Sequence, residues 1–346
     1  MTDRCFATII TVSIFLATSP AATAQASSPA PGPTGKPTAA SRWVQPRTPD
    51  GQPDLAGVWT NATLTPFERP AALGSKQFFT EEEAAAYVKQ RIDGTDAPRP
   101  AEAAPAEING RAYSRVWQDR GTTLVATLRT SQVIDPPNGK VPPMTPEAQA
   151  KFEASHAYFK RHPADGPEDR SLWERCILFG GEGPPMLNEP INNNYQIVQT
   201  PGYVTILVEM NHQARIIPLD GRPHPPQDAR FWSGDPRGHW EGNTLVVEST
   251  NFRSNGKNRF GITYDGTTDD NLRVIERFTR TDPTTMMYQA TIVDPTVYTQ
   301  PWTVELSMRK RSTILYEYAC HEGNYGLSGI LAGARAGEKA AAEKSK

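Results

Sequence analysis

The sequence predicts a mainly β fold, in which an antiparallel meander closes as a barrel or folds as a sandwich. Two observations predict it. From residue 195 onward, apolar and polar residues alternate in short runs that Gly, Pro, Asn and Asp separate. The chain of 346 residues also contains 32 prolines, which suit turns and sheet edges and are too many for a helical protein. At least two helices are expected in an insertion at about 62–190.

The amino-terminal 24 residues have the order of a cleaved secretory signal peptide. Arg4 precedes an apolar run at 5–16, and the small residues that follow end in Ala22-Thr23-Ala24. The apolar run is short for a bilayer span, and an uncleaved membrane anchor is the alternative interpretation. We therefore expect a periplasmic or secreted protein. Residues 25–53 are rich in Pro, Ala and Ser, which predicts a disordered tether.

A single β domain is expected at 54–335, followed by a tail at 336–346. The domain opens with Gly57-Val58-Trp59. A Gly-x-Trp at the start of a strand is typical of small up-and-down barrels of the calycin or lipocalin-like kind, in which the Trp plugs one end. The motif is short, so the barrel and the sandwich both remain open at this point.

Two helices are predicted within the insertion. In the first, at 80–92, Thr80 and Glu83 form a T-x-x-E capping box, and Gly94 can end the helix. In the second, at 145–162, Thr145 caps the helix and Pro146 occupies its first position. A strand is expected between the helices at 123–133, and a surface loop at 98–105.

Eight sequential strands are predicted in the carboxy-terminal half, mostly joined by short turns such as Pro201-Gly202 and Asp220-Gly221. Their expected bounds are 195–200, 203–209, 213–219, 244–250, 272–279, 285–293, 302–308 and 313–320. In the strand at 302–308, apolar residues alternate with Thr303, Glu305 and Ser307, which is typical of a sheet with one wet face. Closure of the meander would also remove exposed edges.

Two cysteines, Cys176 and Cys320, remain after removal of the signal peptide. In an oxidising compartment an isolated pair predicts a disulfide. Two free buried thiols are the alternative, because sequence alone does not show that the residues are near each other.

Charge and motifs count against several functional classes. The formal net charge is −2 and the Lys and Arg residues are scattered, which disfavours a nucleic-acid partner. No span across a membrane is expected after signal cleavage. The sequence has no G-x-S-x-G, H-E-x-x-H or C-x-x-C motif and no Gly-rich phosphate loop at a strand–helix junction. We expect no organic cofactor, and no metal, since the histidines lack a recognised ligand spacing.

Four residues are candidates for acid–base chemistry: His212, Arg222, His224 and Glu276. His212 follows a strand and can exchange protons near neutral pH. Glu276 alternates in phase with apolar residues, so burial would raise its pKa unless a cation such as Arg222 or Arg237 pairs with it. The alternative is that the histidines only solvate a turn and that Glu276 lies on the wet face.

Substrate-binding candidates are expected on two other segments. Trp232, Arg237 and Trp240 lie close together in the sequence, and aromatic walls with a few polar groups are typical of small-molecule pockets. Tyr318 lies near the end of the last predicted strand and is a further candidate. A loop whose tryptophans only pack is the alternative for the first group.

The stretch GHWEGNTLVVESTNF at 238–252 closely resembles the signature of a large family of exported bacterial proteins with no assigned activity. The similarity continues through shorter motifs at 173–176, 199–201, 220–224, 276–278, 294–295, 301–302 and 319–324. Family members more often have Asp where this chain has Asn243 and Glu248. The resemblance implies export and a domain from about residue 54 to residue 335, and it implies no reaction.

These observations favour a small exported enzyme that acts on an apolar or aromatic molecule in a barrel cavity. In this hypothesis His212 and Glu276 exchange protons, and Arg222 or Arg237 holds a negative charge, in lyase, isomerase or hydrolase chemistry. A periplasmic carrier that only binds a hydrophobic ligand is one alternative, and a structural envelope protein is another. Two or more convergent titratable groups in the interior would favour the enzyme over the carrier.

Overall fold

A computed structural model describes residues 43–96, 118–253 and 271–345 of the chain. The predicted signal peptide, most of the predicted tether and the loop predicted at 98–105 lie outside these residues. The α-helices are α1 (Glu81–Asp96), α3 (Pro146–Arg161) and α4 (Tyr325–Lys344). The strands are β1 (Gly57–Thr60), β2 (Val133–Asp135), β3 (Asn194–Thr200), β4 (Tyr203–Val208), β5 (Ala214–Pro218), β6 (Asp235–Glu241), β7 (Thr244–Thr250), β8 (Arg273–Arg280), β9 (Thr285–Val293) and β10 (Trp302–Arg311).

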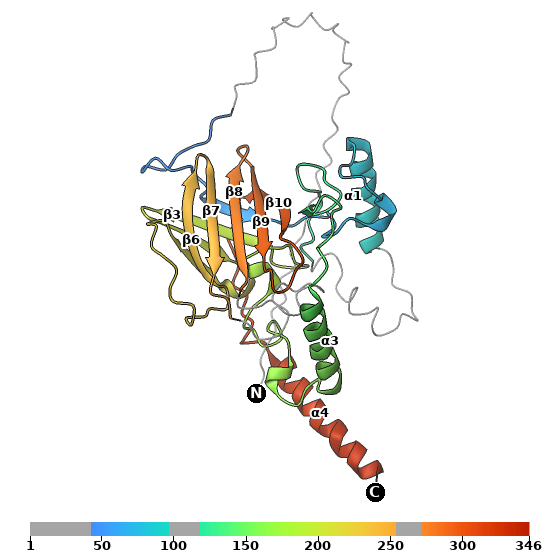
Figure 1. The fold of residues 1–346 in the computed structure, drawn as a ribbon. Helices are drawn as coiled ribbons and strands as arrows, with labels where there is room; N and C mark the ends of the chain where they lie inside the picture. The colour runs from blue at the N-terminus through green and yellow to red at the C-terminus, as the bar shows by residue number, and fades with distance from the viewer. Residues whose placement is uncertain (1–42, 97–117, 254–270, 346) are drawn as a thin grey trace, which may run out of the picture. The chain divides into compact units, whose positions relative to one another are not determined.

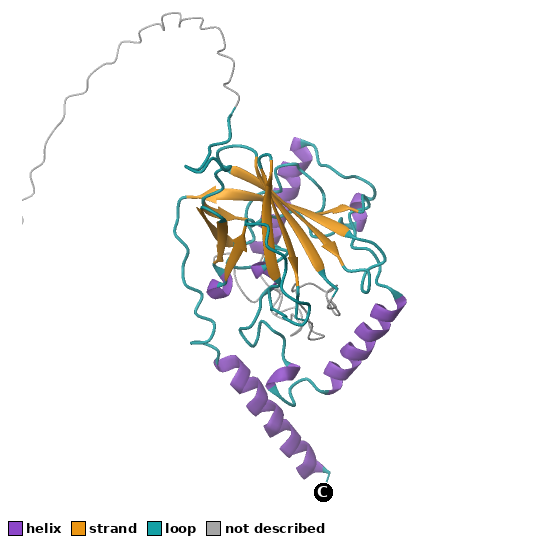
Figure 2. Ribbon diagram, turned by 60° about the vertical axis from the view of Figure 1, so that its left-hand side comes forward, coloured by secondary structure: helices purple, strands orange, loops and turns teal. Residues whose placement is uncertain are grey.

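The described strands form one antiparallel sheet of ten strands, which curls into a nearly closed barrel (Figure 1). Nine of them follow one another in the order β5-β4-β3-β1-β10-β9-β8-β7-β6, and β2 pairs with β10 outside this order. Two meanders, β3 to β5 and β6 to β10, are thus joined through the short strand β1. Figure 2 shows the same sheet, with its strands in orange, from a second direction. The prediction of a closed or nearly closed sheet is confirmed, with the barrel as its form.

The two ends of the strand order, β5 and β6, meet by packing at Gly238. A Cβ atom added to Gly238 on β6 would lie 2.7 Å from Cγ2 of Ile217 and 2.7 Å from Cδ2 of Leu219. Only a residue without a side chain allows the two strands to approach this closely. The seam of the barrel therefore depends on glycine at this position.

The core lies inside the barrel, because alternate residues of each strand point inward. In β9 every second residue from Met286 to Ile292 is buried, and in β10 Trp302, Val304, Leu306 and Met308 are buried. Trp59 is also fully buried, and the Arg280 guanidinium carbon lies 5.7 Å from the centroid of its ring. The Gly-x-Trp motif thus contributes a large aromatic side chain to the core.

Residues 43–53, which the sequence assigned to the tether, include contacts with the domain. The Arg280 guanidinium carbon also lies 5.7 Å from the ring centroid of Trp43, and Gln45 donates a hydrogen bond to the carbonyl oxygen of Asp54 over 2.9 Å. Arg47 and Pro53 form an isolated β-bridge. These contacts place residues 43–53 with the β domain and not in the predicted tether.

Two of the helices follow their predicted caps. In α1 the Glu83 carboxylate accepts from the Thr80 N–H over 2.8 Å, and the Thr80 hydroxyl accepts from the Glu83 N–H over 3.2 Å, which confirms the capping box. The helix continues past Gly94 to Asp96. Thr145 caps α3, as predicted. None of the helices in the described ranges is long and apolar enough to cross a bilayer.

Two predicted strands are absent from the described structure, for different reasons. Residues 313–320 are irregular, because β10 already pairs with β9, β1 and β2 and this segment leaves the sheet toward Cys176. Residues 123–132 are also irregular, and only Val133 of that prediction belongs to a strand. Conversely, residues 235–241 form β6, which was not among the predicted strands.

The segment at 123–132 covers the outer face of β10. The Ala126 N–H donates to the Ser307 hydroxyl over 2.7 Å, and the Thr127 hydroxyl donates to the Glu305 carboxylate over 2.9 Å. As a result, Glu305 is only 6% exposed and Ser307 only 3% exposed. The prediction of a wet outer face is therefore wrong for this part of β10, since a polar segment packs on its polar residues.

Helix α4 starts earlier than the predicted tail. Asn324 caps it by accepting a hydrogen bond from the Leu327 N–H, and the helix runs from Tyr325. Just before it, Cys320 forms a disulfide with Cys176, and their Cα atoms are 5.8 Å apart. The predicted disulfide is confirmed, and it ties the segment after β10 to the segment that precedes the buried loop described below.

Candidate functional site

Three titratable side chains converge inside the barrel. Arg215 points inward from β5, Glu276 from β8 and Tyr288 from β9, and each is almost fully buried. The Arg215 guanidinium forms a two-pronged pair with the Glu276 carboxylate, in which one Nη donates to Oε1 over 3.0 Å and the other to Oε2. The Tyr288 hydroxyl donates to the same Oε1 over 2.9 Å. Strands from both meanders thus place one connected polar cluster in an apolar core.

The environment fixes the charge state of this cluster. Burial alone would lower the pKa of Arg215, but the charge and hydrogen bonds of Glu276 raise it above its ordinary value. Burial, and then the negative charge of Glu276, raise the pKa of Tyr288 well above its usual range. Arg215 is therefore a fixed cation, and the Tyr288 phenol keeps its proton at neutral pH.

A loop at 181–187, here called the inner segment, covers the cluster. All seven of its residues are buried, which is unusual for a loop, because buried backbone groups need partners. Barrel side chains supply these partners. The Met186 N–H donates to the Tyr288 hydroxyl over 2.7 Å, and the Asn61 amide donates to the Met186 carbonyl over 2.9 Å. The Tyr195 hydroxyl donates to the Gly181 carbonyl over 2.8 Å.

The inner segment lies directly on the charged pair. A Cβ atom added to Gly183 would be 3.2 Å from Nη1 of Arg215 and 2.6 Å from Cγ of Met186. Gly183 also has a φ of +73°, which favours glycine. The inner segment thus occupies the space next to the guanidinium that a ligand of the cluster would need.

Glu182, in the inner segment, is a second buried carboxyl group. Its Oε1 accepts from the Phe179 N–H over 2.9 Å, and its Oε2 has no hydrogen-bond partner in the described structure. Burial raises the pKa of Glu182 to about 8, although the Phe179 N–H and the polar Asn211 side chain oppose the rise. The Oδ1 atom of Asn211 is also buried without a partner. A protonated Glu182 fits this environment, because a neutral carboxyl group can donate a hydrogen bond as well as accept one.

The predicted catalytic residues are not brought together. Glu276 is fully buried in the phase that the sequence predicted, and the cation that pairs with it is Arg215. His212 is exposed in the turn between β4 and β5, so the expected His212–Glu276 pair is not formed here. Arg222 is exposed and pairs with Asp220. The alternation of β8 located Glu276, whereas a position in a turn could not show where His212 points.

His224 belongs to a separate cluster at the start of β6. Its Nδ1 lies 2.6 Å from Oδ2 of Asp235, and Arg237 donates to Oδ1 of the same carboxylate over 2.8 Å. Both His224 and Arg237 are half-buried. This cluster joins two of the predicted site residues to each other, and no interaction among the described residues joins it to Glu276.

The aromatic candidates lie in different places. Trp232 is half-buried with the Arg253 guanidinium carbon 5.0 Å from its ring centroid. Trp240, on β6, packs against the main core. Tyr318 packs edge-on against Phe179, with ring centroids 5.5 Å apart, and so lies beside the segment that leads to Glu182. Tyr318 is therefore near the buried loop, whereas Trp232 lies just before β6 and Trp240 lies on β6.

Sequence reasoning missed Arg215, Tyr288 and Glu182 as site residues. The first two had a usable signal, because each alternates in phase with buried apolar residues of its own strand. Glu182 had none, since a Gly- and Pro-rich stretch is expected on the surface. Among the described residues, no three His, Cys, Asp or Glu side chains are grouped so that they could hold a metal ion.

Comparison with known proteins adds no assignment. No protein-family model matches the sequence, and no curated protein or solved structure matches it. The resemblance of residues 238–252 to a family of exported bacterial proteins stays a prediction. In the structure this stretch forms the β6–β7 hairpin and its exit, where the Asn251 amide donates to the carbonyl oxygens of Pro226 and Ala229 over 2.9 and 3.0 Å.

Proposed function

We propose that the protein is an exported enzyme that transfers a proton to or from an apolar or aromatic small molecule inside the barrel. The observation that carries this proposal is the convergence of Arg215, Glu276 and Tyr288 in a buried, water-excluded site. A carrier for a hydrophobic ligand needs no such group of titratable side chains. A purely structural barrel would be at least as stable with apolar residues of similar volume in place of the ion pair.

The proposed chemistry is a proton relay. Tyr288 lies between two groups, since it donates to Glu276 and accepts from the Met186 N–H. When the inner segment withdraws, the acceptor side of the Tyr288 oxygen becomes available to a substrate. The phenol then takes a proton from the substrate and passes its own proton to the Glu276 carboxylate. Arg215 stabilises the negative charge that develops on the substrate.

The path to the cluster runs through the inner segment. Its residues close the space over Arg215 and Tyr288, so the proposal requires the inner segment to open. The inner segment is a loop held by side-chain hydrogen bonds and not by strand pairing, so a local opening would break these bonds and leave the sheet intact. Closure behind a bound substrate would exclude water from the reaction.

The test uses the purified mature protein and a mixture of apolar and aromatic small molecules in D2O, followed by mass spectrometry. Proton transfer at carbon appears as uptake of deuterium, and lyase or hydrolase chemistry appears as new masses. We expect turnover by the wild type and a loss of at least about 100-fold in Tyr288→Phe. Tyr158→Phe, on the exposed side of α3, is the matched control and should keep full activity.

Two outcomes would overturn the enzyme proposal. Equal turnover by the wild type and Tyr288→Phe would remove the barrel cluster from the chemistry. Retention of a compound without any change of mass would show a carrier, and Tyr288→Phe would then alter its affinity alone.

A further inference from the structure

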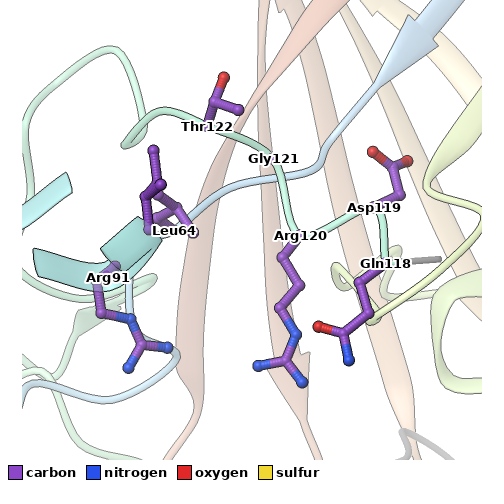
Figure 3. Close-up of a pocket in the computed structure, with 8 residues that line it drawn as sticks. Leu64, Arg91, Gln118, Asp119, Arg120, Gly121 and Thr122 are labelled. Atoms are coloured by element: carbon purple, nitrogen blue, oxygen red, sulfur yellow. The ribbon is translucent and has the colours of Figure 1, made fainter. Parts of the chain in front are cut away.

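The two ends of the inner segment are held in different ways. The segment that follows it, at 188–193, leads to β3 and is held by hydrogen bonds. The Asn193 amide donates to the Asp119 carbonyl over 2.6 Å, and the Asn193 N–H donates to Oδ2 of Asp119 over 3.4 Å. Residues 118–122 also line a small pocket, in which the Asp119 carboxylate points away from Arg120 (Figure 3). This end is therefore fixed by bonds that a thiol reagent does not break.

The segment that precedes the inner segment, at 174–180, is tied to a distant part of the chain by the disulfide. Cys176 is bonded to Cys320, which lies in the stretch at 312–324 between β10 and α4 (Figure 1). We call this stretch the strap. No residue of the strap belongs to a helix or a strand, and none is buried. The disulfide is therefore the covalent link between an exposed stretch of chain and the start of a buried loop.

Contacts beside the disulfide lead directly into the inner segment. The Tyr318 ring of the strap meets the Phe179 ring edge-on, and the Phe179 N–H donates to Oε1 of Glu182 over 2.9 Å. The Asn211 amide donates to the Cys176 carbonyl over 3.4 Å, and its side chain also opposes the rise in the pKa of Glu182. The position of the strap is thus coupled to the position of the buried Glu182 carboxyl group.

Contacts of a weaker kind support the disulfide. Asn324 donates to the Glu174 carbonyl over 2.8 Å, and the Tyr316 N–H donates to the Glu209 carboxylate over 3.4 Å. The Tyr316 side chain is itself exposed. Each such hydrogen bond contributes little to stability, because water offers the same groups an alternative partner. The covalent bond is therefore the restraint whose loss would change the freedom of the strap most.

The disulfide restrains the open state of the inner segment more than the closed state. In the closed state the inner segment is held by hydrogen bonds to Tyr288, Asn61 and Tyr195, none of which involves sulfur. In an open state the preceding segment would have to move with the inner segment, and the cross-link to the strap limits this freedom. Because a cross-link lowers the entropy of the more flexible state, breaking it favours opening.

We propose that the disulfide between Cys176 and Cys320 is a redox-sensitive restraint on the inner segment, and that its reduction by a dithiol lets the inner segment open more often. As a control of catalysis this restraint rests on the proposed function. As a control of the movement of the inner segment it does not.

The chemical step is thiol–disulfide exchange. Cys176 is buried and Cys320 is half-buried, so Cys320 is the better placed of the two for attack by a thiolate from solution. The attack forms a mixed disulfide with Cys320, and Cys176 leaves as a thiolate that takes up a proton. The second thiol of the reagent then displaces Cys320. The protein gains two thiols, and the dithiol is oxidised to a disulfide.

The test is amide hydrogen exchange of Met186 in the mature protein at several low urea concentrations, before and after reduction by dithiothreitol without oxygen. The variant Cys176→Ala/Cys320→Ala reports the same state without a reductant. We expect the protection factor of Met186 to fall by about tenfold or more in both cases, while its exchange stays insensitive to low urea. The amide of Val247 in β7 reports global unfolding in the same samples.

Gly238→Ala is the matched control, because it weakens the barrel at its seam and leaves the disulfide intact. It should speed the exchange of Val247 and leave the exchange of Met186 unchanged. Circular dichroism shows whether Cys176→Ala/Cys320→Ala is folded, and reduction of the wild type carries the test if the variant is not.

Three results would overturn the proposal. Reduction could leave the protection of Met186 unchanged, or Met186 could then exchange with the urea dependence of Val247. An equal fall of Met186 protection in Gly238→Ala would show that lost global stability, and not the restraint, explains the effect. Turnover is not the readout, so failure of the enzyme proposal would leave a positive result intact, and a negative result here would leave the enzyme proposal standing.

Discussion

A few buried polar residues control the stability of this barrel. Replacing one member of the buried ion pair should lower the free energy of unfolding strongly, whereas replacing both members should lower it much less. Glu276 neutralises Arg215, whose side chain is only 2% exposed. An unpaired buried charge is far more costly than a buried pair is stabilising. The free energy of unfolding should therefore respond to single substitutions here more strongly than to those at exposed ion pairs.

Glu276→Gln should lower the free energy of unfolding by about 3–5 kcal/mol, measured by urea denaturation, because it leaves the Arg215 cation unpaired. The same change at Glu241, which pairs with Arg277 on the outer face, should have little effect. The double variant Arg215→Met/Glu276→Leu should lose much less than Glu276→Gln. A double variant as unstable as the single one would contradict this account of the pair.

Glu182 makes the stability depend on pH. Its pKa of about 8 in the folded protein lies above its ordinary value in the unfolded chain, so the folded state keeps a proton that the unfolded state releases. The stabilisation that this proton provides is fully present below the ordinary pKa of a glutamate, and it is lost as the pH rises toward 8. In this window, the free energy of unfolding of Glu182→Gln should rise relative to that of the wild type by about 1.4 kcal/mol per pH unit.

The measurement is the free energy of unfolding of both proteins from pH 5 to pH 9. Glu248→Gln, at an exposed carboxylate, controls for the amide itself. A difference between Glu182→Gln and the wild type that stays constant with pH would show that Glu182 is ionised in the folded protein.

Residue positions could be predicted from sequence where a strand fixed the direction of the side chain. The alternation of β8 was enough to bury Glu276, but the partner of Glu276 comes from β5, and pairing across a barrel depends on which distant strands face each other. Glu182 lies in a loop, and no local pattern shows that a Gly- and Pro-rich loop folds inward.

At the scale of elements, strands with a clear alternation of apolar and polar residues were predicted almost to the residue. Segments whose structure depends on contacts with distant parts of the chain were not. The strand at 285–293 has the predicted bounds of β9. The segments at 123–132 and 313–320 carry β-forming residues, but the first is used as a cover over β10 and the second is drawn away toward the disulfide. Tertiary context decides such segments, since β propensity reports mainly how a side chain packs.

The seam between β5 and β6 gives a prediction of its own. Gly238→Ala should lower the free energy of unfolding by about 1–3 kcal/mol in urea denaturation, because the added methyl group overlaps Ile217 and Leu219. The control is Gly326→Ala in α4, where an added Cβ meets open space and the helix should gain about 0.5–1 kcal/mol. Unchanged stability in Gly238→Ala would mean that the barrel is not closed by this contact.

At the scale of the whole molecule, the central claim is that the barrel interior is a reaction site that opens, and not a sealed core. The two possibilities differ in the behaviour of the inner segment. A sealed core would release the inner segment only when the entire barrel unfolds. A reaction site would release it in a local opening that leaves the strands paired.

Amide hydrogen exchange of Met186 tests this claim most directly, because its N–H is bonded to the Tyr288 hydroxyl that the substrate must reach. The reference is the amide of Val247, in β7, which is fully buried in the barrel wall. We predict that Met186 exchanges faster than Val247 by orders of magnitude under native conditions, and that its exchange is insensitive to low urea. Exchange of Met186 only at the rate of global unfolding, with the same urea dependence as Val247, would contradict the account.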